Sequence, residues 1–141
     1  MNDTRPCGAG ILVFTGNRYL LQQRGPASRS HQGCWDVTAG GGLSNGEDEL
    51  DGALREYREE MGAAPELLVT RSVTWVRPLG SAHTGRRYTV FLAWVAGEYE
   101  PCPPDKGIVS AWAWVTRSEI EKLPLHPSVA PGLAALLGEK G

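Results

Sequence analysis

A helical segment in the middle of the chain lies between runs that have the composition of short strands. Between about Asp48 and Met61 the apolar residues recur at i, i+4, i+7 and i+11, as Leu50, Leu54, Tyr57 and Met61. This spacing indicates a helix with one buried stripe. Gly62 follows directly, in the position after a helix end that glycine favours. A helix of this kind has to bury its stripe against another layer, and only the flanking runs can supply one.

These flanking runs predict a sheet. Residues 9–14 and 18–23 are expected to form a hairpin around a turn at 15–17, residues 35–38 a brief strand, 67–76 and 87–95 a second pair, and 111–115 a last strand. Residues 39–42 are expected to form an irregular turn, and the proline-rich stretch 98–107 a loop. Thr116 and Glu119 form a capping-box pattern for a short helix. Residues 128–137 predict a closing helix that tolerates Pro131 in its first turn. The order predicts an α+β fold.

Size and composition narrow the functional classes. The 141 residues suggest a single domain, 1–141. The net charge of −2 argues against non-specific electrostatic binding of nucleic acid. The apolar runs are too short to cross a membrane. Cys7, Cys34 and Cys102 are odd in number and lack a C-x-x-C pair, so a zinc site or a disulfide framework is not expected. Because the N-terminus lacks the pattern of a signal peptide, the cytoplasm is the expected location.

Three glutamates share one flank of the expected helix. At about 100° per residue, Glu56, Glu59 and Glu60 fall within one arc beside the apolar stripe. Like charges at this spacing destabilise a helix unless a cation neutralises them, and Mg²⁺ prefers carboxylate oxygens, water and phosphate. The preceding glycine run favours close approach of an anion to backbone. Taken alone, the R-E-Y-R-E-E segment is more often a solvated acidic surface with an Arg55–Glu59 ion pair.

The wider spacing resembles the Nudix box. Its polar and glycine positions are matched by Gly41, Glu47, Arg55-Glu56, Glu59-Glu60 and Gly62 within residues 41–63. Seven such coincidences arise by chance with odds of about 10⁻⁸ per starting point. Tyr57 and Ala63 depart mildly from the usual apolar choices. L-L-Q-Q-R at 20–24 and W-D-V-T-A-G-G at 35–41 resemble the family's approach to the box, and Trp114-Val115 with Glu119 its exit.

The resemblance implies a mixed β-sheet sandwiched between helices, with the box as a loop-helix-loop. It implies metal-dependent hydrolysis of a diphosphate linkage in a nucleoside diphosphate derivative or nucleoside triphosphate. By position, Glu59 and Glu60 resemble the main ligands of Mg²⁺, with Mn²⁺ as the alternative, and Glu56 a further ligand or the group that deprotonates water. Glu47 and Arg55 resemble a salt-bridged pair that supports the site. The resemblance also implies that Gly40 contacts both the metal and the substrate, and that Arg24 and Gly41 contact the substrate.

Several further residues carry weaker expectations. Many family members supply another acidic residue from the loop before the last strand. In this chain no glutamate occupies that place. Asp105 is the first candidate to take its role, ahead of Glu98 and Glu100. A solvated loop acid is an equally good interpretation of each. His83, Arg86 and Arg87 could reach phosphate but fit a polar turn better. Trp35 and Trp75 could stack on a base, although burial is the better interpretation. His31 has no partner visible in the sequence.

Two alternatives belong to other functional classes. An isopentenyl-diphosphate-isomerase-like enzyme would need a catalytic cysteine where this chain has Val37, Thr38 and Ala39, with Cys34 lying upstream. The second alternative is a non-catalytic, nucleotide-binding Nudix-like domain. The intact set of carboxylates argues against it, because their mutual repulsion is costly when no metal ion neutralises it. The sequence does not identify the group that is linked to the diphosphate. It also leaves the oligomeric state open, with a homodimer among the options.

Overall fold

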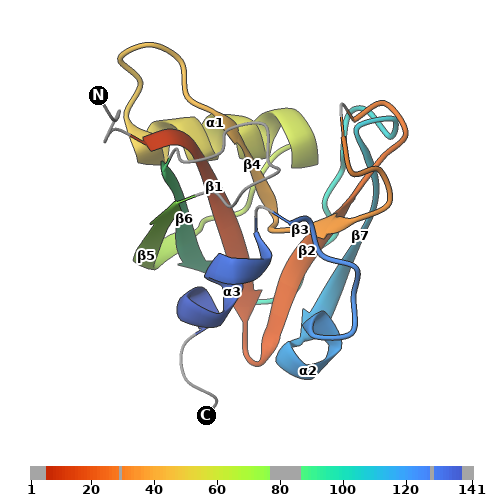
Figure 1. The fold of residues 1–141 in the computed structure, drawn as a ribbon. Coiled ribbons are helices and arrows are strands. Elements are labelled where there is room, and N and C mark those ends of the chain that lie inside the picture. The colour runs from red at the N-terminus through yellow and green to blue at the C-terminus, as the bar shows by residue number, and fades with distance from the viewer. Residues whose placement is uncertain (1–5, 29, 77–86, 128, 138–141) are drawn as a thin grey trace.

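The computed structural model describes residues 6–28, 30–76, 87–127 and 129–137. Its strands are β1 (Pro6–Thr15), β2 (Arg18–Arg24), β3 (Trp35–Asp36), β4 (Ala39–Gly42), β5 (Leu68–Val76), β6 (Arg87–Trp94) and β7 (Val109–Thr116). The helices are α1 (Glu49–Met61), α2 (Arg117–Ile120) and α3 (Ala130–Leu137). The strands form one mixed sheet in the order β3-β2-β1-β6-β5, with β4 also paired to β1 and β7 to β2 (Figure 1).

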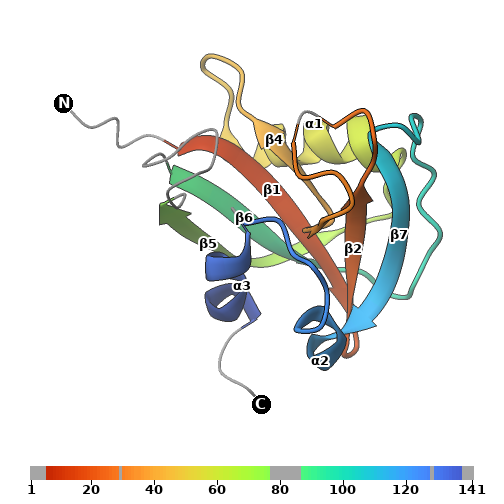
Figure 2. The same cartoon turned by 45° about the vertical axis from the view of Figure 1, so that its right-hand side comes forward.

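Helices cover both faces of this sheet, as expected of the α+β sandwich. Alternate side chains of β1 point to opposite faces: Ala9, Ile11 and Val13 belong to the cluster beneath α1, whereas Leu12 belongs to the cluster that includes α2 and α3. Figure 2 shows α1 and α3 on opposite sides of β1. None of the helices in the described ranges is long and apolar enough to span a membrane.

The helix limits agree closely with the sequence. Asp48 is the N-cap of α1, and its side chain accepts hydrogen bonds from the backbone N–H groups of Leu50 and Asp51. Gly62, at φ 85°, ends the helix. The buried stripe is centred on Ala53, Tyr57 and Met61, while Leu50 and Leu54 are only half-buried. The capping box of Thr116 and Glu119 is present in α2. The closing helix starts at Ala130, and Ser128 lies outside the described residues.

The expectation of an irregular turn at residues 39–42 was wrong. Ala39–Gly42 is β4, which pairs antiparallel with Gly8 to Ile11 of β1. The glycines are there because the Tyr88 side chain fills the space next to them: a Cβ built on Gly40 would lie 2.0 Å from the Tyr88 hydroxyl, and one on Gly10 would lie 2.6 Å from it. A glycine run ordinarily weakens a strand, and here it makes room for a side chain from a neighbouring strand.

Strand β2 separates from β1 and opens the sheet beside the helix. The two strands are paired from Val13↔Leu20 to Thr15↔Arg18, and β4 takes over the same edge of β1 further on. At the point of separation, the buried Thr38 hydroxyl accepts a hydrogen bond from Val13 N (2.8 Å) and donates one to Leu20 O (2.5 Å). A side chain thus satisfies the backbone groups where the strand ladder ends. We call this separation the β1–β2 fork.

Candidate active site

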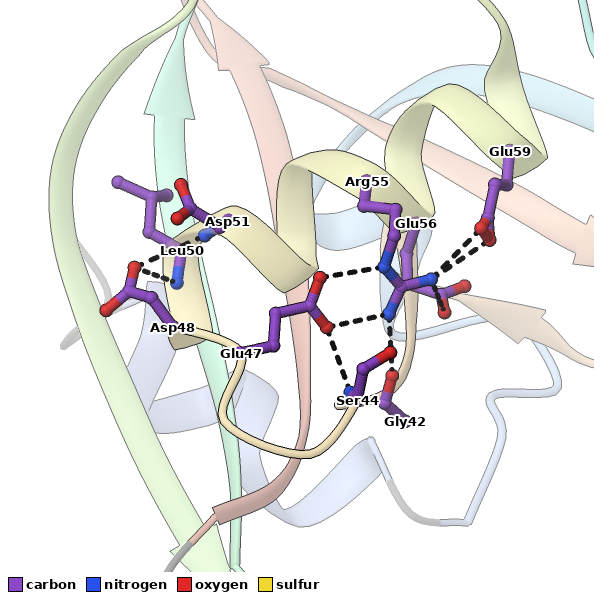
Figure 3. A network of polar contacts seen from close by, with 9 residues as sticks. All are labelled: Gly42, Ser44, Glu47, Asp48, Leu50, Asp51, Arg55, Glu56 and Glu59. Atoms are coloured by element: carbon purple, nitrogen blue, oxygen red, sulfur yellow. Dashed lines mark hydrogen bonds and ion pairs between the residues drawn. The ribbon is translucent and has the colours of Figure 1, made fainter.

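Glu47 and Arg55 fasten the loop before α1 to the helix. Arg55 Nε donates to Glu47 Oε2 (2.8 Å) and Arg55 Nη2 to Glu47 Oε1 (3.0 Å), a two-pronged contact (Figure 3). Glu47 Oε1 also accepts from Ser44 N (3.0 Å), which closes the loop. The hydrogen bonds from Arg55 lower the pKa of Glu47 to about 2. The pair is therefore charged at neutral pH and holds both ends of the loop.

Arg55 also orients two of the three helix carboxylates. Its Nη1 donates to Glu56 Oε1 (3.0 Å) and to both carboxylate oxygens of Glu59 (3.0 Å each), and its Nη2 donates to Gly42 O (3.0 Å). Glu59 is nonetheless exposed, with 52% of its side chain accessible, against 15% for Glu56. The arginine thus joins the carboxylates of the helix to the glycine strand beside it.

Glu60 points into the β1–β2 fork and is the most buried of the three carboxylates. Its Oε1 accepts hydrogen bonds from Gln22 Nε2 (2.6 Å) and from Gly40 N (3.3 Å). Burial raises the pKa of Glu60 well above its ordinary value, and the Glu56 carboxylate adds to the rise, while the donors from Gln22 and Gly40 oppose it. Glu56 and Glu60 thus form a close pair of acids.

The glycine strand lets the backbone approach this pair closely. A Cβ built on Gly41 would lie 2.5 Å from Glu56 Cδ and 2.6–2.7 Å from its two oxygens. Any side chain at residue 41 would therefore displace the Glu56 carboxylate. Gly40 has no room for a side chain because the Tyr88 hydroxyl and the backbone of β1 lie next to it, and Gly41 has none because of the Glu56 carboxylate.

A cleft of about 650 Å³ opens over these groups. We call the part lined by Glu56, Glu60 and Gly40 to Gly42 the acidic end, and Tyr88 lines the cleft next to Gly40. The remaining lining side chains are more varied and include Arg24, Ser28, Ser30, His31, Ile108, His126 and Val129. Gln22 and Asp36, which are paired between β2 and β3, also line the cleft. Glu59 is not among the described residues that line the cleft.

The acidic end fits a divalent cation. The two carboxylates, of which only Glu56 is ion-paired with Arg55, and the backbone carbonyls of the half-buried glycine strand supply oxygen donors, the chemistry that Mg²⁺ and Mn²⁺ accept. Within the described ranges, no three His, Cys, Asp or Glu side chains already converge as a complete ligand set. Mg²⁺ typically binds through one or two carboxylates and fills its remaining positions with water and phosphate, so the Glu56–Glu60 pair is sufficient as a protein contribution.

The structure separates the other expected residues into two groups. Arg24 lines the cleft, where its Nε donates to Ser30 O (2.9 Å) and its Nη1 lies 3.7 Å from Asp36 Oδ2. Asp105 is an exposed turn residue whose Oδ1 accepts from Gly107 N (2.8 Å). The other loop acids are also exposed, and Glu98 lies 3.8 Å from Arg18. None of these three acids belongs to the described lining of the cleft.

The aromatic residues expected to be packed are packed. Trp35 lies against the cluster beneath α2 and α3, and Trp75 contacts Tyr88, with ring centroids 5.7 Å apart. Cys34, the sulfur nearest to the isomerase position, is outside the described lining of the cleft. His83 and Arg86 lie outside the described residues, and Arg87 begins β6.

Among the residues of the site that were not identified from the sequence, four make the most specific contributions. Gln22 and Thr38 organise the β1–β2 fork, and Tyr88 and His126 line the cleft. The signal for the first two was a polar side chain directly next to apolar residues, Leu20-Leu21 before Gln22 and Val37 before Thr38, where burial requires a hydrogen-bond partner. No comparable signal marks Tyr88 or His126, because their positions depend on contacts between distant segments.

The chain resembles known proteins over most of its length. The family model of the NUDIX domain matches residues 4–136. A Mycobacterium tuberculosis protein provisionally named 8-oxo-dGTP diphosphatase 3 is 36% identical over 112 residues, 79% of this chain and 50% of that protein. This chain therefore spans about half the length of that relative.

Solved structures share the fold. The Nudix hydrolase RenU from M. smegmatis has a TM-score of 0.74 at 26% identity, covering 98% of this chain and 91% of that one. A bifunctional NMN adenylyltransferase/ADP ribose pyrophosphatase from Francisella tularensis, complexed with AMP and a manganese ion, has a TM-score of 0.72 at 17% identity, covering 96% of this chain and 42% of that one. With the family match extending over nearly the whole sequence, the chain belongs to the NUDIX domain family.

Proposed function

We propose that this chain is a pyrophosphohydrolase that uses a divalent cation, Mg²⁺ or Mn²⁺, to cleave a diphosphate linkage in a nucleotide-like substrate. The observation that carries the proposal is the Glu56–Glu60 pair at the acidic end of the cleft, beside Gly40 and Gly41. The diphosphatase name of the M. tuberculosis relative supports the same class of reaction. We assign Glu56 and Glu60 as the principal metal ligands, assisted by Gly40 through its backbone and by Glu59 from the rim.

In this proposal the chain's own groups bind the substrate and move one proton. A bound cation lowers the pKa of water and offsets charge on the diphosphate. Glu56, oriented by Arg55, accepts the proton of the attacking water. The water oxygen forms a bond to one phosphorus, and the bond from that phosphorus to the bridging oxygen breaks. The bridging oxygen keeps the electron pair and leaves on the second phosphate. Arg24 is positioned to contact a phosphate of the substrate.

A screen of diphosphate compounds tests this proposal. Nucleoside triphosphates, nucleoside diphosphate sugars and dinucleoside polyphosphates would be incubated with the chain and Mg²⁺ or Mn²⁺, with the products identified by mass. We expect at least one compound to be split at its diphosphate linkage, and the reaction to stop when the metal is chelated. Cleavage that continues in the presence of a chelator would refute the metal-dependent part of the proposal.

Arg55→Lys should lower turnover more than it lowers thermal stability. Lysine keeps the positive charge but cannot reproduce the two-pronged contact with Glu47 while also reaching Glu56. The loop and the carboxylate would then lose their common support, although the helix remains capped by Asp48. Turnover and the midpoint of thermal unfolding would be measured on the same preparation. Unchanged turnover would mean that the contact is an ordinary surface ion pair.

A further inference from the structure

His31 combines two anomalies that the site described so far does not explain. It is the one non-glycine residue of the described chain with a positive φ, 55°, a conformation that histidine adopts only at some cost. Its Nδ1 is also buried, and it is the one such side-chain nitrogen or oxygen in the described residues without a hydrogen-bond partner. Both features cost free energy, and both occur in a residue that lines the cleft.

A second histidine lies against the first. The rings of His31 and His126 have centroids 4.4 Å apart and are inclined by 55°. They come from different parts of the chain, since His31 lies in the loop after β2 and His126 follows the bridge between Trp35 and Leu125. His126 is 8% exposed, and its backbone N donates to Trp35 O (2.8 Å). The structure thus buries His126 on a hydrogen-bonded backbone and places the His31 ring, with its unpaired Nδ1, beside it.

The sheet separates the backbone segment that carries His126 from Gln22 at the acidic end. Gln22, which holds Glu60, is paired with Asp36 of β3, and β3 is bridged in turn to the segment that carries His126. Adjacent strands are about 4.8 Å apart, so the histidine segment lies roughly 10 Å from Gln22 across the sheet. This separation is comparable to that between the phosphate and the base of a nucleotide.

The neighbours of the histidines favour a flat, partly apolar ligand. Val129, whose backbone N donates to His126 O (3.0 Å), contributes a buried aliphatic side chain to the same cleft, and Tyr88 contributes a ring beside Gly40. A half-turn of His31 about χ2 exchanges its Nδ1 with a ring carbon, so this nitrogen can change sides with no change in the backbone. Aromatic faces bind bases by stacking, and a ring nitrogen pairs with the polar edge of a base.

We infer that His31 and His126 form the nucleobase subsite of the cleft, separated by β3 from the Gln22 side chain that holds Glu60. The inference rests on the proposed function, because it assigns the other end of the same substrate. The ligand class is a planar heteroaromatic base carried on a ribose phosphate, whose edge satisfies His31 Nδ1 and whose face lies against the rings.

Binding of monophosphates tests this subsite without any hydrolysis. Affinities for AMP, GMP, CMP, UMP and ribose 5-phosphate would be measured by calorimetry with Mg²⁺ present, since none of these probes contains a diphosphate linkage. We expect at least one nucleotide to bind about tenfold or more tightly than ribose 5-phosphate. His31→Gly should weaken that nucleotide by about 5- to 100-fold, the scale of base–aromatic stacking, and leave ribose 5-phosphate unchanged.

Two further variants control for folding and for the loop. Glycine adopts a positive φ freely, so His31→Gly removes the ring without straining the backbone. His31→Asn, which also tolerates this φ, keeps a hydrogen-bonding group and should recover part of the lost affinity. Gln32→Ala removes an exposed neighbour that donates to Ser28 O and should retain the base preference. An equal loss in Gln32→Ala would mean that the shape of the loop, and not the ring, binds the base, and it would overturn the inference.

The failures of this inference and of the proposed function are distinguishable. Equal affinity of the native chain for all nucleotides and ribose 5-phosphate, or no binding of any of them, would overturn the nucleobase subsite. So would a His31→Gly variant that weakens both kinds of ligand alike. Base-dependent binding by a chain that cleaves no diphosphate compound would support the subsite and refute the hydrolase. Cleavage of a diphosphate compound without base-dependent binding would support the hydrolase and overturn the nucleobase subsite.

Discussion

Glu56→Gln should reduce turnover by about 10²–10⁴-fold at saturating Mg²⁺, the usual scale for loss of a general base. The amide cannot accept a proton from water, although it preserves the shape of the side chain and can still accept the hydrogen bond from Arg55 Nη1. Turnover would be measured with Mg²⁺ raised until the rate no longer increases, because excess metal masks a simple defect in metal affinity.

The comparison variant is Asp105→Asn, which should lose much less. Asp105 accepts a hydrogen bond from Gly107 N within its own exposed turn and is outside the described lining of the cleft. Both substitutions change one acid to its amide, so they alter the net charge equally. A severe loss in Asp105→Asn together with a mild loss in Glu56→Gln would show that the loop acid is the base.

Glu60→Gln should weaken Mn²⁺ binding by at least about 10- to 100-fold, a loss that is seen even when residues supporting a metal ligand are removed. Glu60 is buried beside Glu56, so a cation bound there offsets two charges that the protein interior disfavours. Binding would be measured by titration of the metal-free chain. Glu49→Gln, in the first turn of the same helix, is the matched control and should bind Mn²⁺ normally. Equal affinity in the native chain and Glu60→Gln would remove Glu60 from the metal site.

The fold of the Glu60 variant should persist without metal. The pKa of this carboxyl is raised in the folded chain, so its ionisation costs folding free energy above the ordinary pKa and none below it. Glutamine removes that cost at neutral pH, and its amide oxygen can still accept the hydrogen bond from Gln22. The metal-free variant should therefore unfold at a temperature no lower than the native chain does, so a loss of Mn²⁺ binding would not be attributable to unfolding.

The helix and its charged groups could be predicted because their positions depend on sequence spacing alone. A helical period places Glu59, at i+4, within reach of Arg55, and the apolar stripe fixes which side of the helix is buried. The N-cap and the glycine end follow from single residues. These features are local, so tertiary contacts did not have to be known.

The β1–β2 fork could not be predicted, because it depends on contacts between distant segments. Residues 39–42 have the composition of a turn, yet they pair with β1, and glycine is needed at residue 40 because Tyr88 occupies the space that a Cβ would take. The depth of Glu60 depends likewise on Gln22, 38 positions earlier. Periodicity identified the three carboxylates as a group but not their unequal burial, which leaves Glu59 exposed and Glu60 inside the fork.

The central claim, hydrolysis of a diphosphate by this acidic cleft, is tested most directly by running the reaction in H₂¹⁸O. The compound that responds in the screen would be incubated with the chain and Mg²⁺, and the masses of all products determined. We predict two phosphate-bearing products, one of which carries a single ¹⁸O atom, with neither formed by Glu56→Gln at a comparable rate. A product with the mass of the substrate would indicate an isomerase, and binding of nucleotides without any product would indicate a non-catalytic domain; either result would contradict the hydrolase.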